Sequence, residues 1–278
     1  MATATARAPL AAGLALILVL ILAPILAGIA GQAHAQGFEA AYTITAARIP
    51  VGSAALSGRV GPEDYAVSMS GRTGGLLRVL TSGGGNMTVA GTVSGGKLSP
   101  LRYTSKTTAD DDTLAVTMTF KDGNVDELEA TEPPAGEDRV ALTAEHRRQV
   151  LDPLTALLVP AGAGGETVCR RTLPIFDGRR RYDLKLAFKR SEQVKAEVGY
   201  AGPAVICTVA FEPIAGHRRS SPLLTFLTDG RDVEMALAPI PGTAVLAPFR
   251  ITATYMLGNV VMQATRFAAT STSAGQPR

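Results

Sequence analysis

The sequence predicts an all-β protein with mainly antiparallel strands, folded as a curved sheet, an open barrel or a sandwich that carries one packed α-helix. Segments in which apolar and polar residues alternate recur about every ten residues, which is the pattern of half-buried strands. Glycine-rich turns separate these segments, and the chain contains 29 glycines. The clearest alternation runs from Tyr182 to Lys189 and follows the turn-forming pair Asp177-Gly178.

The first 35 residues have the form of a secretory signal peptide. An uncharged apolar run extends from Leu10 to Ala30, and Ala33-His34-Ala35 supplies the small residues of a cleavage site. The run is also long enough to cross a bilayer as an uncleaved anchor, although Pro24 and the cleavage site favour removal. We therefore expect a signal helix within residues 1–35, export to the periplasm, and no stable membrane span in the mature chain.

The mature chain is expected to form a single β-rich domain over residues 36–267, and its first part, residues 36–132, consists of successive strands. Turn residues at Ser94-Gly95-Gly96-Lys97 and Lys121-Asp122-Gly123-Asn124 join neighbouring strands as hairpins. Such closely spaced strands favour an antiparallel sheet over βαβ units. The predicted strands are 38–48, 51–60, 63–72, 86–93, 98–107, 114–120 and 125–130.

One helix is predicted over residues 144–159, where it would link the two parts of the domain. Asp152 would cap a helix that has Pro153 in its first turn, or Pro153 would kink a longer helix. The helix would either fill the mouth of a barrel or pack across one face of the sheet. The apolar residues at helical spacing are Val150, Leu151, Leu154, Leu157 and Leu158.

The second part of the domain, residues 165–267, holds both cysteines. Cys169 is expected in the strand before the Asp177-Gly178 turn, and Cys207 lies on the apolar face of a later strand. A disulfide between them suits an oxidising compartment and would stabilise the fold by roughly 3–4 kcal/mol. The alternative is two unbonded buried cysteines. Further hairpin strands should follow, and the small, polar tail 268–278 should be disordered.

The sequence does not indicate a catalytic centre, so enzymatic activity is uncertain and is not favoured. His146 and His217 are best interpreted as ordinary polar residues, and no nucleophile elbow or His-Glu-x-x-His motif is present. Asp110-Asp111-Asp112 suits a solvated hairpin tip better than a calcium site. No cofactor or metal is predicted. The net charge of +3 is too small to indicate nucleic-acid binding.

A candidate binding surface is formed by Arg179, Arg181 and Lys185, because Arg181 and Lys185 share a strand face. A solvated outer face is the simpler interpretation. Two functions stay open: a non-catalytic protein that binds a lipid-like amphiphile or an envelope partner in a curved sheet, and a scaffolding factor of cell-envelope assembly that uses the basic face. A hydrolase is a third, less favoured hypothesis.

Several segments, taken in their order along the chain, resemble the bacterial family of exported proteins called domain of unknown function 3108. The resemblance implies an exported, β-rich envelope protein with no assigned activity, and it transfers no catalytic residue. The chain departs from the family at Phe226, where a tryptophan is expected. The segments that carry the resemblance are Tyr42–Gly58, Leu151–Leu157, Phe176–Tyr182, Cys207–Gly216 and Leu227–Arg231.

Overall fold

The computed structural model describes residues 36–75, 83–109, 112–131, 138–220, 233–255 and 258–270, together with Leu224 and Thr228. Within these ranges the chain is dominated by antiparallel strands, which confirms the predicted mainly antiparallel β fold, and the strands belong to one long sheet. The proposed signal peptide, Asp110-Asp111 and residues 271–278 lie outside the described part. No helix among the described residues has the length and apolarity to cross a membrane.

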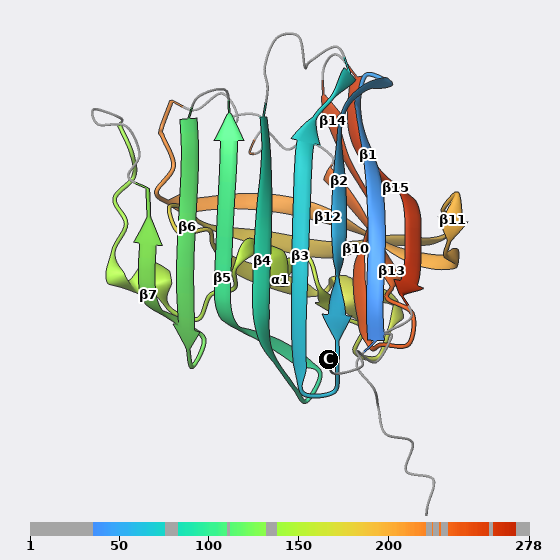
Figure 1. Cartoon of the computed structure of the whole chain (residues 1–278), viewed down its shortest axis with the longest axis horizontal. Coiled ribbons are helices and arrows are strands. Elements are labelled where there is room, and N and C mark those ends of the chain that lie inside the picture. Colours follow the sequence, from blue (N-terminus) through green and yellow to red (C-terminus); the bar gives the residue numbers. More distant parts are fainter. Residues whose placement is uncertain are drawn as a thin grey trace, which may run out of the picture. The chain divides into compact units, whose positions relative to one another are not determined.

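The first half of the sheet is a meander of seven strands, each paired with the next along the chain (Figure 1). Buried and exposed residues alternate along it: on β2, Ala54 and Leu56 are buried whereas Ala55 is exposed. One face of this half therefore covers a core and the other meets solvent. The strands are β1 (Gln36–Ala46), β2 (Ile49–Val60), β3 (Asp64–Thr73), β4 (Gly83–Ser94), β5 (Lys97–Ala109), β6 (Asp112–Lys121) and β7 (Asn124–Ala130).

The second half continues the same sheet from β1 through β15, β14, β13, β12, β10 and β9. The long strands β10 and β12 run across behind the meander (Figure 1). Two short strands join from the side, β8 beside β14 and β11 beside β15. The strands are β8 (Val159–Pro160), β9 (Arg171–Phe176), β10 (Arg181–Lys195), β11 (Val198–Gly199), β12 (Ala201–Ala215), β13 (Val233–Pro239), β14 (Val245–Tyr255) and β15 (Gly258–Thr270).

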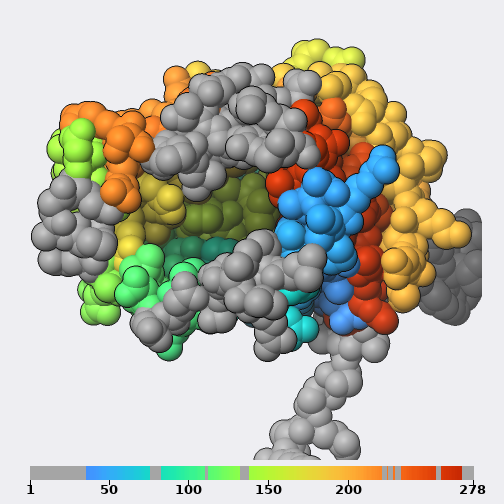
Figure 2. Space-filling model, turned by 90° about the horizontal axis from the view of Figure 1, so that it is seen from above, coloured from blue at the N-terminus to red at the C-terminus, as the bar shows by residue number. Residues whose placement is uncertain are grey.

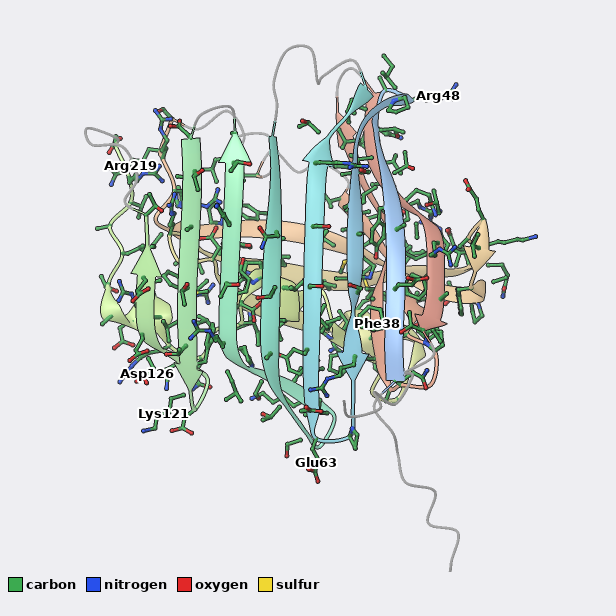
Figure 3. The ribbon with its side chains drawn as sticks, in the orientation of Figure 1. Phe38, Arg48, Glu63, Lys121, Asp126 and Arg219 are labelled. Carbon is green, nitrogen blue, oxygen red and sulfur yellow. A yellow bond between two sulfur atoms is a disulfide. The ribbon has the colours of Figure 1, made fainter. Side chains whose placement is uncertain are left out.

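The buried side chains form two clusters. The larger one joins both halves of the sheet and includes Phe38, which lies towards one end of β1 (Figure 3). The smaller one gathers residues of β9, β10, β12, β13 and β14 with the segment that precedes β9. Strand β12 supplies Ile206 to the first cluster and Cys207 to the second, and β13 likewise supplies Ala236 and Met235. These two strands are therefore buried on both faces.

The predicted disulfide between Cys169 and Cys207 is confirmed, with an S–S distance of 2.01 Å and a Cα–Cα distance of 5.5 Å. Cys169, however, does not lie in a strand: it ends a 3-10 turn, η3 (Gly165–Cys169), just before β9. Both cysteines are fully buried in the smaller cluster. The bond thus fastens a non-strand segment to the two-sided strand β12.

The predicted helix over residues 144–159 is wrong. The segment contains a 3-10 turn, η2 (Ala144–Arg147), and a single α-helical turn, α1 (Pro153–Ala156). Between them the chain is extended: Leu151 donates its N–H to the Pro174 carbonyl at 2.7 Å and accepts from Phe176 N–H at 2.9 Å. Leu151 therefore bonds to the edge of β9, and this pairing keeps its backbone out of a helix.

Two local details of this region follow the sequence. Asp152 caps α1, because its Oδ1 accepts from the backbone N–H groups of Leu154 and Thr155 at 2.9 Å each. Pro153 occupies the first helical position, where its missing N–H costs nothing.

At the other end of the domain, β15 runs to Thr270 and pairs it with Gly37, so the order extends beyond the predicted boundary at residue 267.

Candidate functional site

A cavity of about 270 Å³ lies between strands of the meander and the β9–β10 turn. Figure 2 shows a hollow walled by green residues of the meander and yellow residues of the second half. The cavity combines apolar surface with hydroxyl groups and with charges from the turn. Its lining residues are Met87 on β4, Tyr103, Ser105 and Thr107 on β5, Leu114 and Val116 on β6, Pro153 of α1, and Asp177, Arg179, Arg180 and Tyr182.

The β9–β10 turn is held by Asp177 and by the glycine after it. Asp177 Oδ1 accepts from the N–H groups of Arg179 at 2.9 Å and Arg180 at 2.7 Å. Gly178 has a φ of 93°, and a Cβ atom there would lie 2.4 Å from Val116 Cγ1. A residue with a side chain would therefore be strained and would collide with β6. The Asp-Gly pair that predicts the hairpin also brings the turn against the meander.

A buried carboxyl group lies beside the phenols near this cavity. Asp152 is fully buried, and among the described residues its Oδ2 has no hydrogen-bond partner. Burial raises the pKa of Asp152 from 3.8 to about 6. Burial also raises the pKa of Tyr65, Tyr103 and Tyr182, and the charge of Asp152 contributes to each shift. This carboxyl group can therefore change its protonation state near neutral pH.

The hydroxyl of Tyr65 connects the meander to α1, since it lies 2.7 Å from Thr155 Oγ1 in a buried hydrogen bond. The carboxyl of Asp152 and this hydroxyl pair fix the position of the helical turn, which contributes Pro153 to the cavity. We therefore assign Asp152, Tyr65 and Thr155 a role in positioning α1. In the described ranges, no three side chains of His, Cys, Asp or Glu gather as metal ligands do.

Two of the three cations of the predicted basic surface form ion pairs with neighbouring carboxylates. Arg181 Nη1 lies 2.5 Å from Asp183 Oδ1, and Lys185 Nζ lies 2.7 Å from Glu212 Oε2. Of the three, the cavity lining includes Arg179, and it also includes the next residue, Arg180. The scaffolding hypothesis depends on this surface and stays a prediction.

The two histidines of the described chain make local contacts. His146 Nδ1 accepts from the Thr143 backbone N–H at 3.0 Å, and the His217 carbonyl accepts from the Val140 N–H at 3.0 Å. Sequence reasoning missed Tyr103 and Tyr182 as cavity residues. The alternation at Tyr182 predicts its burial, but no local pattern shows that it shares a cavity with Tyr103 on a strand far away in the sequence.

The family model for "Protein of unknown function (DUF3108)" matches residues 41–265. The chain belongs to this family. The predicted resemblance is thereby confirmed for this DUF3108 protein. No curated protein matches it. A solved structure similar to it is the β-barrel-like protein of the domain of unknown function DUF1849 from Brucella abortus, with 12% sequence identity and a TM-score of 0.48, covering 85% of this chain and 99% of that one.

Proposed function

We propose that this DUF3108 protein is an exported, non-catalytic protein of the periplasm that holds an amphiphilic ligand inside its curved sheet. The cavity beside the β9–β10 turn is the observation that carries the proposal. Met87, Leu114 and Val116 offer apolar surface, while phenols, hydroxyls and guanidinium groups line the rest. Such a lining suits a molecule with a hydrocarbon chain and a polar head.

The size of the cavity narrows the ligand class. Pockets for small molecules usually start at about 300 Å³, and this cavity holds about 270 Å³. That volume suits one alkyl chain better than a lipid with two chains. The ligand we propose is therefore a single-chain amphiphile.

The signal-peptide pattern of residues 1–35 and the Cys169–Cys207 bond support the compartment, because disulfides persist in oxidising surroundings. Expression of the full chain in a Gram-negative host should release a periplasmic protein whose N-terminal sequence begins at Gln36. Recovery of the whole chain in the inner membrane, still starting at Met1, would contradict the export part of the proposal.

The ligand part is tested by extracting the purified protein with organic solvent and identifying bound molecules by mass spectrometry. The wild type and Thr108→Phe, which changes an exposed residue outside the cavity lining, should yield a stoichiometric single-chain amphiphile. Ser105→Phe narrows the cavity from the same strand and should yield at least tenfold less. Empty extracts from all three proteins, or equal yields from all three, would contradict ligand carriage.

A further inference from the structure

A second recess lies beside the β9–β10 turn, and it has a different chemistry from the cavity. This groove of about 280 Å³ is lined by Ala130 and Thr131, by the segment 139–142, and by Gly178, Arg179 and Gly216. We propose that the groove is a separate binding site for an oxyanion at the end of an alkyl chain, held by Arg139 and Arg179. The proposal concerns a recess other than the cavity and does not require a ligand there, although Arg179 lines both.

The groove is built by a short ribbon of two paired backbone segments, residues 138–140 and 216–219, which lies against the β9–β10 turn. Gly216 donates its N–H to the Val140 carbonyl at 2.8 Å, and Arg139 pairs with Arg218 across an isolated bridge. Arg219 continues the ribbon through an ion pair with Asp138, and it lies on the β7 side of the sheet (Figure 3). The ribbon thus forms one wall of the groove.

Gly216 makes the close approach of the ribbon to the turn possible. Its φ is 81°, and a Cβ atom at this position would lie 1.9 Å from the Arg179 carbonyl oxygen. No side chain fits at that distance, so the backbone of the ribbon lies directly against the backbone that carries Arg179. Arg179 is therefore held at the groove by packing on both sides of the turn, at Gly216 and at Gly178.

The two guanidinium groups give the groove its preference for an anion. Arg139 Nη1 donates to the Gly216 carbonyl at 2.9 Å, and Arg179 Nη2 donates to the Thr131 carbonyl. Arg179 Nε is buried without a hydrogen-bond partner among the described residues. Burial lowers the pKa of Arg179, and the nearby charges of Arg180 and Arg139 lower it further, against the opposing effect of Asp177.

An oxyanion would suit the charge of this arrangement. It would accept hydrogen bonds from guanidinium N–H groups at the groove surface, and its charge would offset the repulsion between the two arginines. No Asp or Glu is among the groove's lining residues in the described part of the chain, whereas Asp177 lines the cavity. The groove is therefore the more electropositive of the two recesses.

Apolar side chains next to the arginines define the rest of the ligand. Ala130, Val140, Ala141 and Leu142 line the groove together with the two cations. This combination fits the head of a chain amphiphile, with the oxyanion on the arginines and the first methylenes on the aliphatic side chains. A carboxylate and a phosphate share this chemistry, so the test includes both.

The first experiment is a calorimetric titration of the mature protein with dodecanoate, dodecyl phosphate, dodecanol and inorganic phosphate. The two dodecyl anions should bind, with dodecanol and inorganic phosphate at least tenfold weaker than either. The preferred anion identifies the head group. Equal affinity for dodecanol and dodecanoate, or for inorganic phosphate and dodecyl phosphate, would overturn the proposal.

The second experiment places the binding in the groove. Arg139→Gln removes a charged donor and should weaken binding of the dodecyl anions at least tenfold, whereas Arg147→Gln, an exposed arginine outside the groove, should not change it. Ala141→Glu adds a carboxylate at an exposed groove position and should weaken binding similarly. Unchanged affinity in both groove variants would overturn the proposal.

The cavity variant Ser105→Phe separates this site from the proposed function. Binding of dodecanoate that survives Ser105→Phe but fails in Ala141→Glu supports the groove, whatever the fate of the cavity. Binding that fails in Ser105→Phe and survives in Ala141→Glu belongs to the cavity and contradicts the groove. Circular dichroism of each variant checks that the fold is intact.

Discussion

The two halves of the sheet differ in whether their strands are buried on one face or on both faces. Strands of the meander cover the core with one face, so that Leu56 is buried on β2 while its neighbour Ala55 is exposed. On β13 in the second half, the neighbours Met235 and Ala236 are both buried, in different clusters. The meander buries its apolar face against one core, whereas the second half needs extra segments to cover its other face.

The covering segments explain the irregular part of the chain. Ala156, Val159 and Cys169 come from the stretch that runs from α1 to the start of β9, and all three lie in the smaller cluster. This stretch has almost no regular structure, so it depends on anchors: the disulfide at one end and the Asp152 cap at the other. The second face of the strands that are buried on both sides is thus covered by an irregular segment, and this segment is fixed in place at its two ends.

The largest expected effect contrasts the two halves with one substitution. Ala236→Glu places a carboxylate in a strand that is buried on both faces, and the free energy of unfolding should fall by about 4 kcal/mol or more. Ala55→Glu makes the same change on the solvent face of β2, and it should alter stability by less than about 0.5 kcal/mol. Urea denaturation of the two variants measures both values, and similar losses would break the comparison.

The disulfide should be the next largest contribution. The two cysteines are 38 residues apart, so the loop-entropy model assigns about 4 kcal/mol to the bond. The double variant Cys169→Ala and Cys207→Ala should lose about that much free energy of unfolding. A loss below about 1 kcal/mol would show that the segment before β9 is held by packing alone.

Asp152 should make stability depend on pH. Because burial raises its pKa from 3.8 to about 6, the folded protein binds this proton more tightly than the unfolded chain does. The stability from this group is present below pH 3.8 and is lost as the pH rises through 6, which amounts to about 3 kcal/mol. Asp152→Asn removes the titration. Unfolding free energies of both proteins between pH 4 and 7 should diverge by this amount, and parallel curves would contradict the assignment.

The smallest expected effect concerns the contact between the meander and α1. Tyr65→Phe deletes the buried hydrogen bond to Thr155 Oγ1, and it should cost about 1.5 kcal/mol of unfolding free energy because a buried hydrogen bond is lost. Tyr200→Phe deletes an exposed bond to the Pro203 carbonyl and should cost less than about 0.5 kcal/mol. Equal costs would indicate that α1 does not depend on this contact.

The difference in burial between the two halves also determines which elements the sequence can predict. Alternation reveals the meander, because a strand with one buried face has a period of two. The Asp177-Gly178 turn follows from local chemistry, and the disulfide follows from the presence of only two cysteines in the chain. The apolar residues around Leu151 mimic a helix, but they serve two clusters from an extended chain, with Val150 in the larger and Leu151 against the smaller.

The candidate site is less predictable, since its residues meet only in the folded sheet. The sequence places Arg181 and Lys185 on one strand face, but it does not show that the pairing of β10 with β12 brings Glu212 to Lys185. Arg139 and Arg179 lie far apart in the sequence and are brought to one groove by the fit of Gly216 against the turn. Non-local pairing of this kind leaves no periodic signal.

Because the chain contains no tryptophan, a single introduced tryptophan can report directly on whether the cavity binds a ligand. Leu114 lines the cavity at 39% exposure, and Leu101, on the neighbouring strand at 51% exposure, lies outside the lining. Leu114→Trp and Leu101→Trp therefore report on the inside and the outside of the same sheet. Titration with a bromine-labelled dodecyl chain should give saturable quenching of the tryptophan at position 114 and little at 101. Equal quenching at both positions, or none at either, would contradict ligand binding in the cavity.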